Sequence, residues 1–324
     1  MSARMGLQAR IKQYLVERRH LGFKSRTMGY ALARLSRYAA KVGHSGPLTI
    51  DLMTDWARQA KGGHASRATA ARQLGLLRPF TRWLQQFEPS TEVPTDAVFG
   101  PVPGRMTPHV YREGEIVDLM SAAAKLGPVG GLRCKVVQTL FGLMACTGLR
   151  ISEVLALRDA DVDMKSGVLT IHLSKFGKSR LVPLHPSAVA ALVHYRKQRD
   201  RHVQPSAETP FFVSTRGRLL GKPVGERQIH RIFEQLRRQL GWVDRGTHGH
   251  PRVHDLRHSF AVRRLVLWHE QGEDVDQKML ALSTYLGHAR ISNTYWYLTG
   301  VPELMSLAAK RFEFFADPWE SEDE

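Results

Sequence analysis

The chain of 324 residues has little cysteine and no long apolar run. Its two cysteines, Cys134 and Cys146, are too few for a disulfide-rich scaffold, and their apolar surroundings are typical of reduced core cysteines. No stretch approaches the length of a membrane-spanning helix, and the first fifteen residues lack the continuous apolar segment of a signal peptide. We therefore expect a cytoplasmic protein that has no membrane partner.

Acidic residues are also scarce, because 30 Asp and Glu face 47 Lys and Arg, for a formal net charge of +17. So basic a balance favours a polyanionic partner, most simply nucleic acid, over a generally basic protein without such a partner. Residues 1–50 hold ten basic residues against one acid, Glu17, whereas residues 317–324 hold five acids. This asymmetry predicts an N-terminal part that faces DNA and a tail kept away from phosphate.

Apolar residues at helical spacing dominate the first part of the chain. They predict helices alone up to about Phe87, at Leu7–Arg19, Thr27–Val42, Ile50–Ala60 and Ala65–Phe87. Residues 88–106 are rich in Pro, Gly, Ser and Thr and show no sustained period, which is typical of a linker. We expect a helical domain at residues 1–90, a linker at 91–107 and a second domain at 108–324.

The second domain is predicted to be mainly α with a small β-sheet, an α+β fold. Alternating β-branched runs at Val168–Leu173 and Ser179–Leu184 flank Lys175-Phe-Gly-Lys178 and predict a β-hairpin with Gly177 in its turn. Thr209–Ser214 is predicted to be a third short strand. Helices are expected at Tyr111–Leu126, Leu132–Thr147, Ile151–Leu157, Pro186–Arg199, Gly225–Leu240, His254–His269, Gln277–Leu286, Ile291–Leu298 and Pro302–Phe314.

Basic side chains are the candidates for contact with DNA. The segment Ala65–Phe87 carries arginines on the face opposite its apolar residues, and a solvated basic face explains each of them as well as DNA contact does. The predicted hairpin adds two more cations near its turn. The candidate DNA-contact residues are Arg67, Arg72, Arg78, Lys178 and Arg180.

Arg150 follows an apolar helix and the break at Gly148, and it opens the next helix. A helix start presents free backbone N–H groups and the positive end of a dipole, which suit a phosphate. Glu153 lies three residues on, on the same helix face, where it is placed to orient a catalytic group. The alternative interpretation is a surface Arg–Glu pair.

His254 and Arg257 are three residues apart and project from one helix face. One would hold a non-bridging phosphate oxygen while the other moves a proton. A zinc site is the alternative, because four histidines cluster here and two have helical i, i+4 spacing: His248, His250, His254 and His258. An aspartate, Asp255, stands in place of the glutamate of that zinc motif, and His248 and His250 lie in a Gly-rich segment, which argues against a metal.

A lysine and a phenol complete the set of candidate catalytic groups. Lys175 sits on the predicted hairpin turn, from which a flexible ammonium can enter a cleft. A tyrosine can act as a covalent nucleophile, but spacing alone does not choose among Tyr285, Tyr295 and Tyr297. Two guanidiniums, a proton-transferring group and a phenol are the parts needed to cut a phosphodiester without a metal.

Four segments in order resemble the tyrosine recombinase, or phage integrase, family. They are Ala145-Cys-Thr-Gly-Leu-Arg-Ile-Ser-Glu-Val-Leu-Ala-Leu157, Lys175-Phe-Gly-Lys-Ser-Arg-Leu-Val-Pro-Leu184, HDLRHSFA from His254, and Leu286-Gly-His288 with Tyr297 nine residues later. One such motif means little, whereas four in order over residues 145–297 are highly specific. The helical N-terminal part resembles the core-binding domain of that family.

The resemblance implies which residues hold the scissile phosphate. Arg150 and Arg257 would clamp it, and His288 would hydrogen-bond it. Glu153 matches the acidic residue that supports this site. Neither a metal nor another cofactor is implied.

The resemblance also implies which residues carry out the chemistry. Tyr297 would attack the phosphorus and become a 3′-phosphotyrosine, which chooses it over Tyr295. Lys175 would be the general acid toward the 5′-oxygen, and His254 would assist proton transfer. Fixed cations would stabilise the charge that grows on the phosphate oxygens in the transition state.

We therefore expect a site-specific recombinase that cuts and rejoins double-stranded DNA for the integration, excision or transposition of a mobile element. The resemblance implies a homotetramer on DNA in which a C-terminal helix, expected at Pro302–Phe315, docks on a neighbouring subunit, with accessory recombinases as further partners. A DNA-binding regulator that does not cut is one alternative, against which the six intact catalytic positions argue. A zinc-dependent phosphohydrolase is another, and EDTA sensitivity would separate it.

Overall fold

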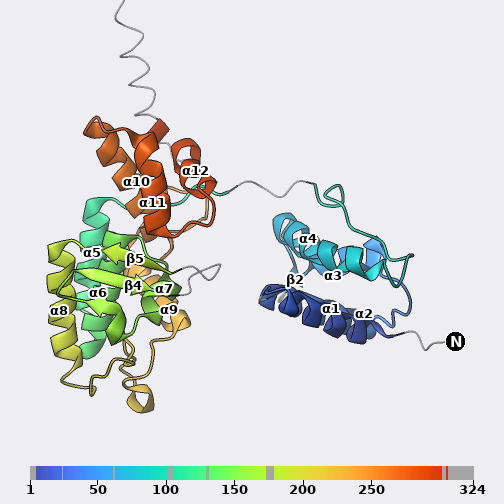
Figure 1. Cartoon of the computed structure of the whole chain (residues 1–324), viewed down its shortest axis with the longest axis horizontal. Coiled ribbons are helices and arrows are strands. Elements are labelled where there is room, and N and C mark those ends of the chain that lie inside the picture. The colour runs from blue at the N-terminus through green and yellow to red at the C-terminus, as the bar shows by residue number, and fades with distance from the viewer. Residues whose placement is uncertain are drawn as a thin grey trace, which may run out of the picture. The chain divides into compact units, whose positions relative to one another are not determined.

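The computed structural model divides into two compact units, Met1–Arg105 and Met106–Glu324 (Figure 1). It describes residues 5–23, 25–60, 63–100, 105–128, 131–172, 179–300 and 304–305. The predicted hairpin turn with Lys175 and Lys178 lies outside the described residues. So does the predicted helix Pro302–Phe314, apart from Leu304 and Met305.

The described part of the first unit consists of helices around one apolar core. Its elements are α1 (Leu7–His20), α2 (Arg26–Lys41), α3 (Ile50–Arg58), β1 (Gln59–Ala60), β2 (Gly63–His64) and α4 (Arg67–Leu84). Leu32, Leu35, Leu77 and Phe80 are buried in this core, as their helical spacing predicts. The antiparallel pair β1–β2 corrects the prediction of helices alone. Strands of two residues are too short to show an alternating pattern in the sequence.

The residues that composition marks as a linker pack in part against the helices of the first unit. Val98 and Phe99 contact its core, and the Glu92 N–H donates to the Leu48 carbonyl over 2.8 Å. The Arg78 Nε donates to the Pro94 carbonyl over 2.9 Å. A stretch rich in Pro and Thr therefore indicates irregular backbone here without indicating freedom from the neighbouring domain.

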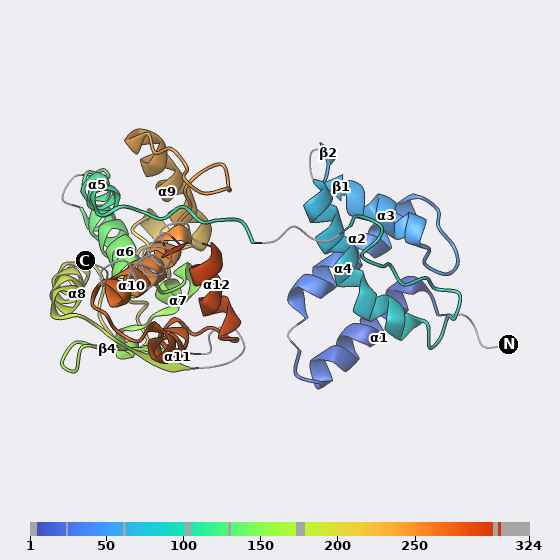
Figure 2. The ribbon, with the colours of Figure 1, turned by 90° about the horizontal axis from the view of Figure 1, so that it is seen from above.

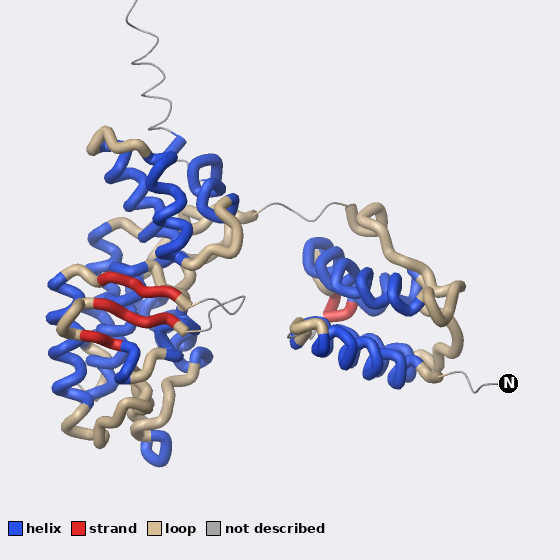
Figure 3. The backbone as a smooth tube through the Cα atoms, in the orientation of Figure 1, coloured by secondary structure: helices blue, strands red, loops and turns tan. Residues whose placement is uncertain are grey.

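The second unit holds a three-stranded antiparallel sheet of order β3–β4–β5 (Figure 3). The strands are β3 (Val162–Asp163), β4 (Val168–Ile171) and β5 (Arg180–Pro183), with Leu169 opposite Val182. The predicted hairpin strands are confirmed over these residues. The predicted strand at Thr209–Ser214 is wrong, because this segment forms only isolated bridges and the third strand is β3. Phe211, Phe212 and Val213 give the segment its strand-like apolar run because they are buried in the core.

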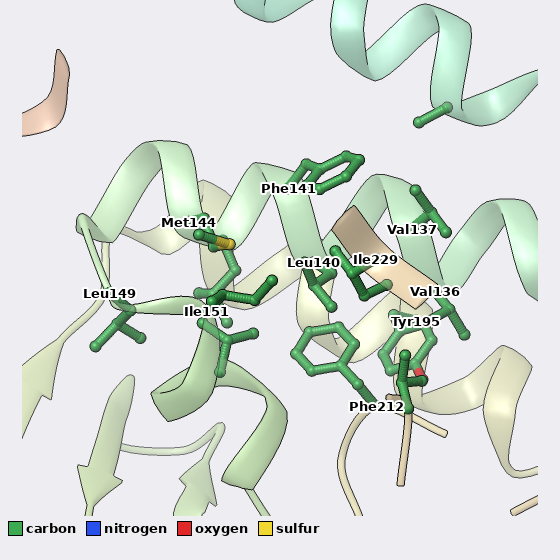
Figure 4. Packing of buried hydrophobic residues seen from close by; sticks show 14 of the residues in the cluster. Val136, Val137, Leu140, Phe141, Met144, Leu149, Ile151, Tyr195, Phe212 and Ile229 are labelled. Carbon is green, nitrogen blue, oxygen red and sulfur yellow. The ribbon is translucent and has the colours of Figure 1, made fainter. Parts of the chain in front are cut away.

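Helices form most of the second unit. Those described are α5 (Glu113–Ala124), α6 (Leu132–Thr147), α7 (Ile151–Ala156), α8 (Pro186–Arg199), α9 (Glu226–Leu240), α10 (Asp255–Glu270), α11 (Val275–Leu286) and α12 (Ser292–Gly300), with short 3-10 turns at Asp159–Asp161 and Gly217–Leu219. Helix α6 runs through the core, where Leu140 and Met144 lie among Ile151, Phe212 and Ile229 (Figure 4). The helix α6 begins and ends at the residues that its apolar run predicts.

The last three described helices form a separate apolar cluster. Helix α11 contacts α10, α12 and strand β5, and the three helices lie together in the second unit (Figure 2). Val262, Leu265, Met279 and Leu282 are buried between them with Tyr297. This packing brings the HDLRH, Leu-Gly-His and tyrosine segments to one place. No helix in the described part of the chain is both long and apolar enough to cross a bilayer.

Candidate active site

Two glycines end the helices that lead into the site. Gly148 ends α6 with φ +64, and Gly287 ends α11 with φ +66, a left-handed conformation that favours glycine. A Cβ at Gly148 would lie 2.6 Å from Cδ1 of Phe260, and a Cβ at Gly287 would lie 2.6 Å from Nη1 of Arg180. Both turns therefore require glycine for their conformation and for the close approach of a neighbour.

Arg257 is buried at the start of α10, with 2% of its surface exposed. Its Nη1 donates to the Gly148 carbonyl and its Nη2 to the Leu286 carbonyl, each over 2.7 Å. Burial, and then the charge of Arg150, lower the pKa of Arg257 to about 10. The guanidinium therefore remains charged at neutral pH, in a fixed position between two helix ends.

Arg150 precedes the first residue of α7 and reaches the same end of α11. Its Nη2 donates to the Gly287 carbonyl over 3.0 Å, and its Nη1 donates to Oε1 of Glu153 over 2.7 Å. The backbone N–H of Arg150 donates to Oε2 of Glu153 over 3.0 Å. The side chain of Glu153 is 5% exposed, so this is not the surface pair of the alternative interpretation. Arg150 and Arg257 thus hold adjacent carbonyls, and the two guanidiniums meet at one helix end.

Two histidines of the HDLRH segment lie beside each other, with ring centroids 4.8 Å apart. Burial, followed by the charge of Arg257, lowers the pKa of His254 to about 4, although part of its side chain is exposed. Burial, followed by His254, lowers the pKa of His258 to about 2. Both imidazoles are therefore neutral at pH 7.

Tyr297 lies among these histidines, whereas the other two candidate tyrosines do not. The Tyr297 hydroxyl is 2.9 Å from Nδ1 of His258, and its side chain is 2% exposed against 37% for Tyr295. Tyr285 instead stacks on Phe260, and burial raises the pKa of Tyr285 to about 12. Tyr297 is thus in contact with a histidine of the HDLRH segment, and its role as the nucleophile stays a prediction.

His288 completes the surroundings of Tyr297. The two rings are stacked at a centroid distance of 6.5 Å, and Nδ1 of His288 is 2.7 Å from the Thr294 hydroxyl oxygen. The sequence placed His288 in the site but did not assign His258 to it. The i, i+4 spacing of His258 from His254 indicates that both histidines lie on one helix face. The sequence used this spacing only as an argument for the zinc alternative.

The predicted DNA-contact residues differ in their surroundings. Arg180 is largely buried, and its Nη2 donates to Oε2 of Glu153 over 2.9 Å. The Arg67 Nε donates to the Phe99 carbonyl over 2.5 Å, and Arg78 pairs with Asp96. Arg72 is exposed on α4. Lys178 and the predicted general acid Lys175 lie outside the described residues.

The four histidines considered for zinc do not form a ligand set in the part of the chain that the structure describes, where no group of three or more metal-ligating side chains occurs. Nη1 of Arg252 lies 3.1 Å from Nδ1 of His248, and Arg252 also pairs with Asp255. A guanidinium in contact with a candidate ligand opposes the binding of a cation at that position.

A basic groove of about 700 Å³ lies in the first unit, between α2, α3 and α4. Its lining is Arg34, Arg37, Tyr38, Lys41, Trp56, Gln59 and Gln73. Nη2 of Arg34 donates to the Gln59 carbonyl and to Oε1 of Gln73, each over 3.3 Å. The sequence did not reveal this groove, because the residues that form it come from three helices and from strand β1 and become neighbours only on folding.

Comparison with known proteins places this geometry in a family. An integrase/recombinase called y4rB from Sinorhizobium fredii is 38% identical over 310 residues, which cover 94% of this chain and 96% of that protein. Tyrosine recombinase XerC from Rhizobium meliloti is 33% identical over 251 residues, covering 78% of this chain and 72% of that protein.

A solved structure and a family model are also similar to this chain. The Tn1549 transposon integrase, in complex with transposon right end DNA, has a similar fold with a TM-score of 0.66, at 17% identity and covering 95% of this chain and 99% of that chain. Residues 109–301 match the description of the phage integrase family. The protein therefore belongs to the phage integrase family.

Proposed function

We propose that the protein is a site-specific tyrosine recombinase that cuts and rejoins DNA strands through Tyr297, for the integration, excision or transposition of a mobile element. The observation that supports this most is the meeting of Arg150 and Arg257 at the end of α11, next to His288 and the Tyr297 helix. Two fixed guanidiniums suit the oxygens of one phosphate, and a phenol near them suits attack on its phosphorus.

The proposed reaction exchanges one ester for another. The Tyr297 oxygen loses its proton, with His254 assisting the transfer, and forms a bond to phosphorus. The bond from phosphorus to the 5′-oxygen breaks, and that oxygen takes a proton from Lys175. The proton released by Tyr297 balances the one that Lys175 gives up. A 3′-phosphotyrosine and a free 5′-hydroxyl result. A 5′-hydroxyl of another strand reverses the step, so rejoining needs neither ATP nor a metal. Arg150 and Arg257 stabilise the charge that grows on the non-bridging oxygens.

The neutral histidines fit this proposal, because a neutral imidazole can either donate or accept a hydrogen bond. His254 would move a proton in the reaction, and His288 would donate to the phosphate. Glu153 holds Arg150 by two hydrogen bonds, which fixes the guanidinium before DNA arrives. Fixing a charge in advance reduces the reorganisation that the transition state requires.

Double-stranded DNA with specific recombination sites is the proposed partner. The groove on the first unit offers three cations for phosphates, at Arg34, Arg37 and Lys41, and amides at Gln59 and Gln73 that suit base edges. The predicted contacts of Arg67, Arg72, Arg78 and Lys178 remain part of this proposal. The DNA complex of the Tn1549 integrase, a protein of similar fold, supports it.

The assembly proposed on DNA is a homotetramer, with accessory recombinases as further partners. Residues 302–315 carry apolar residues at helical spacing, which suits docking of this segment on a neighbouring subunit. The DNA-bound mass, measured by light scattering with and without residues 302–324, tests the assembly. A tetramer that persists without these residues would exclude the exchange.

A covalent adduct with DNA tests the proposed chemistry. Nicked duplexes from the genomic flanks of the gene should become 3′-linked to the protein, and a chelator such as EDTA should leave adduct formation unchanged. Tyr297→Phe should bind these duplexes and form no adduct, whereas the matched variant Tyr295→Phe should form it normally. An adduct that persists in Tyr297→Phe would end the assignment of the nucleophile.

A further inference from the structure

We propose that Arg180 is a positioning residue that fixes the two phosphate-binding arginines and His288 by clamping the end of α11. It would act within the protein and not on DNA. The inference rests on the proposed function, because its effect is measured on the proposed cleavage reaction. It is carried by a contact pattern that the sequence did not reveal.

Three consecutive carbonyls at the end of α11 each accept a hydrogen bond from a different arginine. Nε of Arg180 donates to Tyr285 over 2.7 Å, Nη2 of Arg257 to Leu286 over 2.7 Å, and Nη2 of Arg150 to Gly287 over 3.0 Å. The last carbonyls of a helix have no partner within it and carry the negative end of its dipole. Three guanidiniums therefore complete this helix end.

Glu153 links Arg180 to Arg150 from the other side. Its Oε1 accepts from Nη1 of Arg150 over 2.7 Å and from Nη1 of Arg180 over 3.1 Å. Its Oε2 accepts from Nη2 of Arg180 over 2.9 Å. Burial alone would raise the pKa of Glu153, but the hydrogen bond and charge of Arg180, with help from Arg150, lower it to about 2. Arg180 thus keeps Glu153 ionised and able to hold Arg150.

The clamp also controls where His288 lies. Nη1 of Arg180 approaches so closely that only a glycine fits at position 287, directly before His288. Arg180 is the first residue of β5, so it connects the sheet to the end of α11. A shift of this helix end would move His288 and the carbonyls on which Arg150 and Arg257 rest.

Direct DNA contact by Arg180 fits the structure less well. The side chains of Arg180 and Glu153 are 9% and 5% exposed, and the guanidinium bonds in three directions within the protein. A phosphate would have to displace Glu153 to reach it. An arginine in this position is better suited to orient its neighbours than to bind an exposed ligand.

Substitution by lysine separates the positioning of neighbours from direct contact with DNA. Lysine keeps the charge that a phosphate needs, but it cannot bond to three acceptors in the same fixed geometry. In the full chain, Arg180→Lys and Arg180→Ala should both slow adduct formation at saturating protein by about 10- to 100-fold. Their DNA affinity, measured in the Tyr297→Phe background, should stay within about twofold. Arg231→Ala, at an exposed arginine on α9, should change neither quantity.

Full activity of Arg180→Lys, or a loss of affinity as large as the loss of rate, would overturn the inference. Absence of any adduct in the wild type would instead overturn the proposed function. Gly287→Ala gives a second test if Arg180 variants do not fold, because its Cβ would push against Arg180. Gly241→Ala has the same backbone conformation with nothing near its Cβ, so it should form adduct at the wild-type rate. Equal rates in the two glycine variants would also contradict the clamp.

Discussion

The hydroxyl oxygen of Tyr297 lies 2.9 Å from Nδ1 of His258, and both side chains are enclosed between α10 and α12. A neutral imidazole has one acceptor nitrogen, so the phenol donates to Nδ1 when the proton of His258 is on Nε2. The pKa of His258 is about 2 and that of an ordinary phenol is about 10, so His258 cannot take the proton in this state. The contact therefore holds the phenol of Tyr297 in place and does not take up its proton.

A double-mutant cycle should detect this contact. His258→Leu and Tyr297→Phe each remove one partner of the hydrogen bond, and we expect their effects on the free energy of unfolding to be coupled by about 1 kcal/mol. Hydrogen exchange of the α10 backbone amides at pH 7 would measure the free energy of unfolding of each variant. If the two effects simply add, the hydrogen bond contributes nothing to stability and the holding role is excluded.

Substitutions of Arg150 and Arg257, the proposed phosphate-binding arginines, should affect cleavage much more than binding. Arg257→Lys leaves one ammonium where the guanidinium holds two carbonyls 2.7 Å away, so we expect adduct formation to fall by about 100-fold or more. Arg150→Ala should have an effect of similar size, with only a modest loss of DNA affinity. Single-turnover rates and equilibrium binding would separate the two quantities. Equal losses of rate and affinity would indicate a protein that only binds DNA.

Acid should destabilise the second unit before its carboxylates are protonated. Burial lowers the pKa of His258 from 6.5 to about 2, so below pH 6.5 the unfolded chain binds a proton that the folded protein does not. The contribution of His258 to the free energy of unfolding is then fully present above pH 6.5. It falls with decreasing pH, by about 1.4 kcal/mol per pH unit. Burial lowers the pKa of His109 in the same direction, while the partly exposed His254 contributes less because water screens it.

His258→Leu isolates this effect. The variant lacks the proton-binding group, so its unfolding free energy should change less than that of the wild type between pH 7 and pH 5. Glu153 does not interfere, because its lowered pKa of about 2 causes loss of stability only below its ordinary value of 4.5. Urea unfolding at several pH values would measure both proteins. Parallel curves would mean that His258 takes up its proton in the folded state.

The sequence predicted the helices and the family well because both depend on local patterns. Apolar spacing predicted the bounds of α6 and α8 to the residue, and the four motifs indicated the family to which the chain belongs. It did not predict β1, β2 and β3, since two-residue strands are held by tertiary contacts and leave no period. It also took buried Phe211 and Phe212 for a strand, because apolar runs are alike in strands and in buried loops.

The roles of Arg180 and His258 could not be predicted for a different reason. Arg180 is separated from Tyr285 by 105 residues and His258 from Tyr297 by 39, so no local pattern reports these contacts. The pattern of a basic residue on a predicted hairpin indicates contact with solvent or DNA. Only the fold brings Glu153 into contact with Arg180. Burial of a charged side chain is the signal that distinguishes a positioning arginine, and it requires the structure.

The basic groove of the first unit should determine how DNA binding responds to salt. If Arg37 and Lys41 each neutralise a phosphate, replacing either by alanine should reduce the slope of log K against log salt by about 0.9, for every duplex tested. Gln73→Ala should leave the slope unchanged but alter which sequences are preferred, because an amide reads a base edge and releases no counterion. Titrations of the Tyr297→Phe protein with flank duplexes and unrelated duplexes would measure both effects. Arg19→Ala, at an exposed arginine on α1 outside the groove, is the matched control. An equal change of slope in the control and the groove variants would show that general charge, and not the groove, binds the DNA.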